Sequence, residues 1–243
     1  MLSIAQFLLS FPCQKCLLIY YQNSTLLVDV VTTELSAPLY WGLVPDSLKQ
    51  KVADNLALEV KKTNHIDVGL LGTKTLLGAL SQNGYADLAF TVASQETYPS
   101  WGWWIKNGAT TLYENWDIDA SSDLSRNHIM FGAISAWFYK SLGGILPNEQ
   151  SPGFKSFILR PNFVNGLNHF EAEFESRYGL IISKWKRRGN HVEYSCQVPP
   201  NSKAVLYLKG VKIKLGDKEF TTEEVQNQGI DLTAGSYTFL IEE

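Results

Sequence analysis

The sequence predicts an α+β protein in two parts, a helical part over 36–148 and a β-rich part over 149–243. In the first part, apolar residues recur every three to four positions, which is typical of amphipathic helices. In the second part, short alternating or β-branched stretches are separated by turn residues, which is typical of an antiparallel sandwich. Residues 1–35 show neither pattern, so we treat them as an atypical N-terminal segment.

The composition is that of a globular protein with no polyanionic partner. Of 243 residues, 45% are hydrophobic and 19% are charged, and the net charge is -3. This balance argues against disorder and against nucleic acid as a partner. The one basic cluster, within 184–188, lies beside Gly189-Asn190, which predicts a solvated hairpin turn.

Cysteine usage and hydropathy give no sign of a metal, a cofactor or a membrane. Cys13, Cys16 and Cys196 are an odd number, and the single C-x-x-C has neither a second pair nor a nearby histidine. No run reaches the ~18 apolar residues of a membrane span. The apolar stretch 1–12 lacks a basic start and a clear cleavage site. We therefore expect a cytoplasmic protein, with a secreted or periplasmic location as the alternative.

The helical part is expected to contain about five helices. The first begins at Pro45-Asp46-Ser47, whose acid and hydroxyl groups suit the free N–H groups of a helix start. Its apolar stripe recurs every fourth position, at Leu48, Val52, Leu56 and Val60. The other helices are expected over about 68–82, Tyr85–Gln95, Trp101–Lys106 and about 126–142, the last ending at Gly143-Gly144.

The β-rich part is expected to contain at least six strands spaced about ten residues apart. Glycine, proline and asparagine pairs separate them, as turns of an antiparallel sandwich would. The expected strands are Phe154–Leu159, His169–Phe174, Leu180–Trp185, His191–Val198, Ala204–Leu208 and Ser236–Ile241.

The strongest signal for chemistry is an aromatic stretch with a carboxylate inside it. The sequences 98–104 and 108–117 hold several Trp and Tyr residues, and Glu114 lies between Tyr113 and Trp116. Such a carboxylate suits a general acid or base acting on a sugar. The alternative is a helix-end glutamate packed among aromatics without a function.

Several motifs in order resemble the bacterial α-L-rhamnosidases of glycoside hydrolase family 78. They are "GLVPDSLKQKVADNLALEV", "HIDVGLLGTKTLLGALSQNGYADLAF", "YPSWGWWIKNGATTLYENWD", "SRNHIMFGAISAWFYKSLGGILP" and "PGFKSFILRP". The stretch "SRYGLIISKWKRRGNHVEYSCQVPPNSKAVLYL" is similar to the closing β-domain of that family. The likeness covers about residues 36–210.

This resemblance implies an (α/α)6 barrel flanked by β-domains, and inverting hydrolysis of terminal α-L-rhamnosyl residues. Glu114 falls at the catalytic base of the family's "GATT-x-x-E-x-W" motif. The implied substrate is a rhamnose-containing oligosaccharide or glycoside. The residues that match sugar-binding positions are Trp116, His128 and Trp101 and, as weaker matches, Tyr98 and His65.

The chain also departs from the family. We find no D-x-x-x-R-x-E-R-x-x-W motif, which carries the family's general acid, and about five helices cannot close a ring of twelve. We therefore expect a C-terminal portion that carries the base side of the site, is inactive alone and has the missing N-terminal part as a partner. The alternative is a non-catalytic carbohydrate-binding or structural protein.

Overall fold

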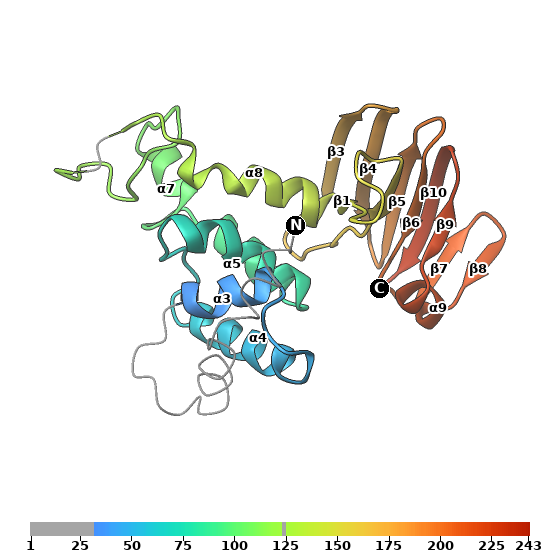
Figure 1. The fold of residues 1–243 in the computed structure, drawn as a ribbon, viewed down its shortest axis with the longest axis horizontal. Helices are drawn as coiled ribbons and strands as arrows, with labels where there is room; N and C mark the ends of the chain where they lie inside the picture. The colour runs from blue at the N-terminus through green and yellow to red at the C-terminus, as the bar shows by residue number, and fades with distance from the viewer. Residues whose placement is uncertain (1–31, 123–124) are drawn as a thin grey trace. The chain divides into compact units, whose positions relative to one another are not determined.

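The structure is a computed structural model that describes residues 32–122 and 125–243. The chain divides into two compact units, Met1–Ile134 and Ser135–Glu243, shown in Figure 1. Nearly all of the predicted N-terminal segment, with Cys13 and Cys16, lies outside the described residues. The described part is of the α+β class, as the sequence predicts.

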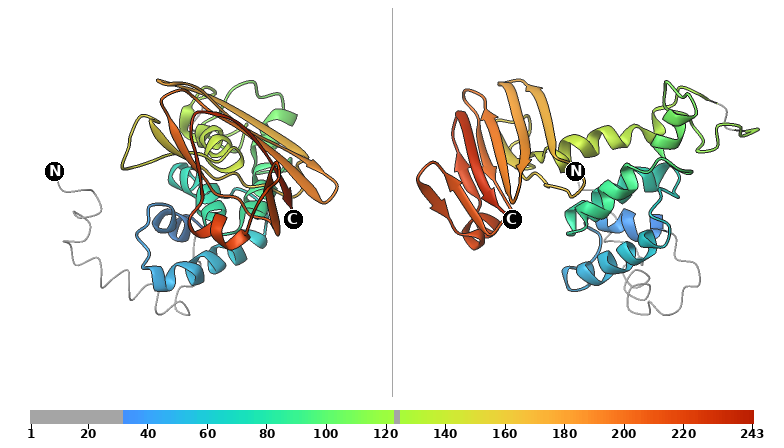
Figure 2. Two further views of the ribbon diagram at one scale, coloured as in Figure 1. Left: turned by 90° about the vertical axis from the view of Figure 1, so that its right-hand side faces the viewer. Right: turned by 180° about the vertical axis from the view of Figure 1, so that it is seen from behind.

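The first unit is helical. Figures 1 and 2 show α3, α4 and α5 side by side, and each pair of these helices is in contact. Four of the predicted helices are confirmed, with ends displaced by no more than two residues. The helices are α3 (Thr32–Tyr40), α4 (Asp46–Lys61), α5 (Leu70–Gln82), α6 (Ala86–Ala93) and α7 (Trp101–Lys106).

The pairing of α3 with α5 organises this unit, and the sequence did not predict α3. Small groups allow the close approach: the hydroxyls of Ser36 and Thr75 are hydrogen-bonded at 2.9 Å in the buried interface. A Cβ on Gly78 would lie 2.5 Å from the ring of Tyr40. Pro38 inside α3 removes a backbone donor, and it weakens the helical signal in the sequence.

The predicted helix over 126–142 is wrong at its beginning. Helical structure starts only at η1 (Ile129–Gly132), a 3₁₀ turn, and continues through α8 (Ala133–Trp137) into the π-helical turn η2 (Phe138–Leu142). The backbone N–H of Met130 donates to the His128 side chain, which marks His128 as the cap. The predicted stop is confirmed, since Gly144 has φ +66°.

The second unit holds two mostly antiparallel sheets. One has the order β1-β2-β6-β9, with β2 and β6 parallel, and the other has the order β3-β4-β5-β10-β7-β8. The short elements β1, β7, β8, β9 and α9 were not predicted. The strands are β1 (Ile145–Pro147), β2 (Ser156–Leu159), β3 (His169–Ser176), β4 (Gly179–Arg188), β5 (His191–Val198), β6 (Lys203–Leu206), β7 (Lys212–Leu215), β8 (Lys218–Phe220), β9 (Ile230–Leu232) and β10 (Gly235–Glu242), with α9 (Thr222–Asn227) between β8 and β9.

The core of this unit is built on β4 and β5. The buried Trp185 donates its indole N–H to the Leu142 carbonyl at 3.1 Å, and the Ser183 hydroxyl donates to the Gly143 carbonyl. Tyr194 is fully buried, and its hydroxyl lies 3.1 Å from Ser183. These bonds tie the end of η2 to the sheet.

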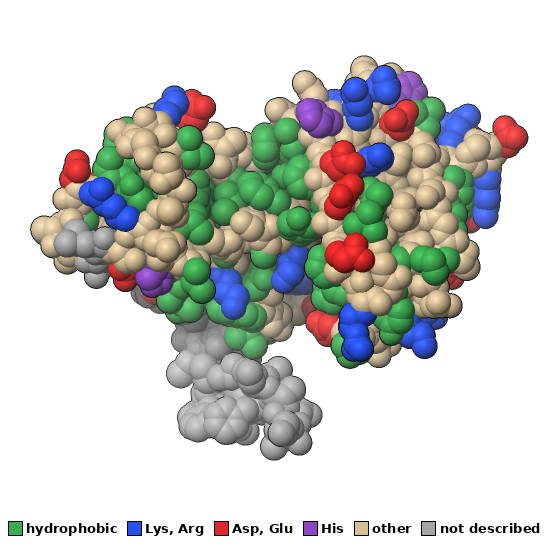
Figure 3. All heavy atoms as spheres, turned by 90° about the horizontal axis from the view of Figure 1, so that it is seen from above, with side chains coloured by type: hydrophobic (Ala, Val, Ile, Leu, Met, Phe, Trp, Pro, Cys, Tyr) green, Lys and Arg blue, Asp and Glu red, His purple; other side chains and the backbone are tan. Residues whose placement is uncertain are grey.

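Charged side chains of both signs are scattered over the face of this unit that Figure 3 shows. The predicted hairpin turn at Gly189-Asn190 is confirmed between β4 and β5. Most of the basic cluster on β4 is paired with carboxylates: Lys184 with Glu171 at 3.8 Å, Arg188 with Glu193 at 3.7 Å, and Arg187 with Glu243.

Candidate active site

Two stretches of the helical unit run past each other in opposite directions and carry Glu114 and His128. The Glu114 N–H donates to the Ser125 carbonyl at 2.9 Å, and the His128 N–H donates to the Leu112 carbonyl at 2.8 Å. The Thr111 hydroxyl donates to the Arg126 carbonyl. We call these stretches, 111–114 and 125–128, the paired segments.

The paired segments bring Glu114 and His128 side by side. Nε2 of His128 lies 3.9 Å from Oε1 of Glu114, and the two side chains are 40% and 31% exposed. The Ser125 N–H lies 3.4 Å from Oε2 of Glu114 and donates to it. The carboxylate thus has one oxygen held by the backbone and the other turned toward the imidazole.

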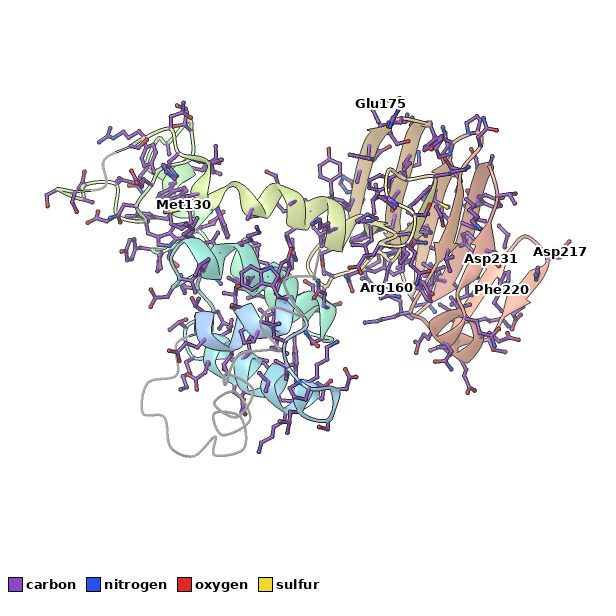
Figure 4. The ribbon with its side chains drawn as sticks, viewed as in Figure 1. Met130, Arg160, Glu175, Asp217, Phe220 and Asp231 are labelled. Carbon is purple, nitrogen blue, oxygen red and sulfur yellow. The ribbon has the colours of Figure 1, made fainter. Side chains whose placement is uncertain are left out.

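The hydrogen bond to His128 fixes its tautomer. Nδ1 accepts from the N–H of Met130 at 3.1 Å, so in the neutral ring the proton sits on Nε2. Figure 4 labels Met130 at this end of the helical unit. The distance of 3.9 Å is too long for a direct hydrogen bond but leaves a donor and an acceptor side by side. A hydroxyl group or a water can accept from Nε2–H and donate to the carboxylate.

A buried aromatic cluster contacts the paired segments through the Tyr113 ring. Trp104 stacks on Trp116 at a centroid distance of 4.7 Å, and Phe131 lies 4.2 Å from Trp116. Trp101 meets Trp116 edge-on at 5.3 Å. Because Trp116 follows Glu114 by two residues and Phe131 follows His128 by three, the cluster anchors the backbone near both residues.

Each indole N–H in this cluster is used inside the protein. Trp101 donates to the Phe131 carbonyl, Trp104 to the Trp116 carbonyl and Trp116 to the Val68 carbonyl, at 3.1, 2.9 and 2.9 Å. Trp101 and Trp116 are only 6% and 8% exposed. Both residues are therefore buried members of this cluster, which we call the aromatic floor, and do not form an open stacking surface.

His65 and Tyr98 lie on neighbouring loops. Nε2 of His65 is 2.7 Å from the Thr97 hydroxyl, next to Tyr98, and its Nδ1 is 2.6 Å from the Thr63 carbonyl. The Tyr98 ring is 52% exposed and meets Trp103 edge-on at 6.2 Å. These contacts link the loop 62–69 to the loop 94–100. The bond from Trp116 to the Val68 carbonyl links the loop 62–69 to a residue two positions after Glu114.

Several residues that shape the site were not singled out from the sequence. The ring centroids of Tyr113 and Trp104 are 5.8 Å apart, and the Arg126 guanidinium lies 5.5 Å from the centre of the Tyr113 ring. Ser125 bonds Glu114, and Phe131 completes the cluster. No local pattern signals these roles, because each depends on pairing across a loop.

Metal-ligating side chains do not gather here. Within residues 32–122 and 125–243, no group of three or more His, Cys, Asp or Glu side chains could hold a metal ion. The helices of that same portion include none long and apolar enough to cross a membrane.

Both units match models of known protein domains. Residues 18–142, just over half of the chain, match the bacterial alpha-L-rhamnosidase 6 hairpin glycosidase domain. Residues 144–221 match the bacterial alpha-L-rhamnosidase C-terminal domain. The first match begins inside the segment 1–35, which the sequence analysis set apart.

Curated relatives are named alpha-L-rhamnosidase. One from Streptomyces avermitilis is 34% identical over 178 residues, 70% of this chain and 17% of that protein. One from Formosa agariphila is 27% identical over 235 residues, 91% of this chain and 24% of that protein. The chain therefore spans a quarter or less of the length of these relatives.

Solved structures of alpha-L-rhamnosidases also superpose on this chain. The alpha-L-rhamnosidase from Dictyoglumus thermophilum superposes with a TM-score of 0.78 at 30% identity, over 88% of this chain and 26% of that one. The Streptomyces avermitilis enzyme complexed with L-rhamnose gives 0.76 at 28% identity, over 87% and 22%.

The matched domains define a glycosidase of helical hairpins joined to a C-terminal domain. The chain belongs to the bacterial α-L-rhamnosidase family, and it matches the C-terminal portion of the family's members.

Proposed function

We propose that this chain supplies the base side of an inverting α-L-rhamnosidase site, with Glu114 as the general base. The observation that carries the proposal is the facing pair: the Glu114 carboxylate lies 3.9 Å from the Nε2–H of His128, with both groups partly open to solvent. The pair stands on a buried aromatic floor in a chain of the rhamnosidase family.

The chemistry follows from the donor and acceptor geometry. In inverting hydrolysis, a carboxylate takes a proton from water as the water oxygen attacks the anomeric carbon, and an acid protonates the leaving oxygen. Glu114 accepts the water proton. His128 presents Nε2–H to a sugar hydroxyl, because Met130 occupies its Nδ1.

The general acid must come from outside this sequence. The two carboxyl groups of an inverting site stand roughly 6.5–9.5 Å apart, and the family's acidic motif is missing here. We propose that the helical unit is part of an (α/α)6 barrel and that the two sheets form the sandwich of the closing β-domain. The chain alone then has little or no glycosidase activity.

Exposed apolar side chains support a partner for the helical unit. Trp41, Leu58 and Leu71 are 46%, 61% and 57% exposed, and Ile105 and Ile129 are 72% and 87% exposed. We propose that further helices of the six-hairpin domain cover them, supplied by the N-terminal part of a rhamnosidase.

A non-catalytic sugar-binding module is not favoured. Modules of that kind would stack sugars on open aromatic faces. Here Trp101, Trp104 and Trp116 are buried, and their N–H groups bond backbone carbonyls.

An aryl α-L-rhamnoside assay tests the proposal. The purified chain should release little or no aryl alcohol by itself. Turnover that survives Glu114→Gln would contradict the role of Glu114. Turnover that Glu114→Gln abolishes would support Glu114 but contradict the dependence on a missing acid.

A further inference from the structure

We propose that Arg126 is a positioning residue. Its contact with the Tyr113 ring keeps the two paired segments aligned, so that Glu114 and His128 stay side by side. Arg126 lies on one paired segment and Tyr113 on the other. The guanidinium carbon is 5.5 Å from the centre of the ring, within the range of a cation–π contact. This inference rests on the proposed function, because it explains how the proposed base is aligned.

The contact reaches the buried core through successive rings. Tyr113 lies 5.8 Å from Trp104, which stacks on Trp116 at 4.7 Å. Arg126 is therefore attached to the aromatic floor although it is itself exposed. The guanidinium suits this position because its flat, weakly hydrated surface stacks on aromatic rings better than an ammonium does.

The register matters because the hydrogen bonds of the paired segments flank this contact. Glu114 follows Tyr113 and bonds Ser125, which precedes Arg126. Two residues further, His128 bonds Leu112. A change in this register would move the Glu114 and His128 side chains apart. The pair would then no longer share one hydroxyl or water between them.

Arg126 connects the segment 125–128 to the aromatic cluster at a point where the described residues provide few other contacts. Residues 125–127 are exposed, and among the described residues the hydrogen bonds of Ser125 and Asn127 stay within the paired segments. Removal of the Arg126 side chain leaves these surface hydrogen bonds to hold the register. Such bonds open readily in exposed backbone.

Nuclear magnetic resonance on the full chain tests this without any sugar. In the wild type, ring protons of His128 should show a nuclear Overhauser effect to the Glu114 methylenes. The Glu114 and His128 amides should be protected from hydrogen exchange. In Arg126→Ala, we expect the Overhauser effect to weaken at least twofold, and the two amides to exchange about two- to fivefold faster.

Matched variants separate positioning from general loss of structure. Arg126→Lys keeps a cation and should restore part of the signal, and Tyr113→Phe keeps the ring and should preserve most of it. Arg160→Ala removes a similar contact, 4.3 Å from the Tyr207 ring centre in the other unit, and should leave the pair unchanged. An unchanged Overhauser effect and unchanged exchange in Arg126→Ala would overturn the inference.

The outcome is distinguishable from failure of the proposed function. If the wild type shows the Overhauser effect and Arg126→Ala loses it, the positioning role holds even where the chain fails to bind rhamnose. If L-rhamnose shifts the resonances of Glu114 and His128 equally in the wild type and in Arg126→Ala, the positioning role is contradicted while the proposed site stands.

Discussion

Trp104 stacks on Trp116 with ring centroids 4.7 Å apart and donates its indole N–H to the Trp116 carbonyl at 2.9 Å. This double link joins α7 to the segment that carries Glu114. The buried tryptophans therefore anchor the backbone next to Glu114, whose carboxylate is only partly open to solvent.

Trp104→Ala should destabilise the helical unit by about 3–5 kcal/mol, since it removes a large buried ring and leaves a cavity. Urea denaturation followed by circular dichroism measures the loss. Ile105→Ala is the control on the same helix: its side chain is 72% exposed, and the change should stay within about 0.5 kcal/mol. Equal effects of the two variants would show that Trp104 does not anchor the unit.

Gly144→Ala should be far more damaging than Gly189→Ala. Both glycines have similar positive φ values, +66° and +64°, so both alanines carry about 1–2 kcal/mol of backbone strain. At Gly144 a Cβ would also lie 2.1 Å from the Arg160 carbonyl carbon, whereas at Gly189 nothing lies within 4 Å. Thermal unfolding of the two variants checks this. Similar melting temperatures would mean that the turn before β1 can shift.

Ser183→Ala should destabilise the β-rich unit by about 1–3 kcal/mol, because the buried Tyr194 hydroxyl loses its bond to Ser183 and the Gly143 carbonyl loses its donor. The double variant Ser183→Ala/Tyr194→Phe should cost less than the sum of the two single variants, since both buried polar groups are then gone. Denaturant titration of the four proteins gives the coupling. Strict additivity would show that the two hydroxyls do not interact.

The buried thiol of Cys196 predicts a loss of stability at alkaline pH. Burial raises the pKa of Cys196 to about 12 from 9.0, and burial also raises the pKa of Tyr194. Both groups are neutral when protonated, so above about pH 9 the unfolded chain releases protons that the folded chain retains. The free energy of unfolding should fall by about 1.4 kcal/mol per pH unit through Cys196 as pH rises from about 9 toward 12. Tyr194, whose ordinary pKa is 10.0, adds to this fall only at higher pH.

The variant Cys196→Ala isolates the thiol's share of this slope. Its stability should decline less steeply with pH than that of the wild type, whatever its absolute value. Iodoacetamide should also leave native Cys196 unlabelled near pH 8, because the thiolate is the reactive form. Mass spectrometry of the peptide that contains Cys196 shows the label, and rapid native labelling would contradict the burial.

Periodic segments could be predicted from the sequence, and segments held by distant partners could not. Apolar residues at every fourth position of α4 and alternating residues along β5 are local patterns, and the structure confirms both elements. The helix α3 contains Pro38, and local sequence patterns did not predict it. The segment 125–128 pairs with 111–114 across a loop, whereas local patterns placed most of it in a helix. Neither feature has a signal within its own segment.

The same distinction applies to the site. The family resemblance pointed to Glu114 and His128, and the structure places them 3.9 Å apart. The resemblance did not reveal that Trp101 and Trp116 are buried, because burial depends on which rings meet across the fold. Nor could the sequence show the contact between Arg126 and Tyr113, which depends on the same pairing.

Titration of the isotope-labelled chain with L-rhamnose, followed by nuclear magnetic resonance, shows whether Glu114 and His128 form a sugar site. It detects millimolar binding, which suits a site that carries only the base side. We expect saturable shifts of the Glu114 and His128 resonances, lost in His128→Ala and absent with D-glucose. Saturable shifts confined to the β-rich unit, or none at all, would contradict a sugar site at Glu114 and His128.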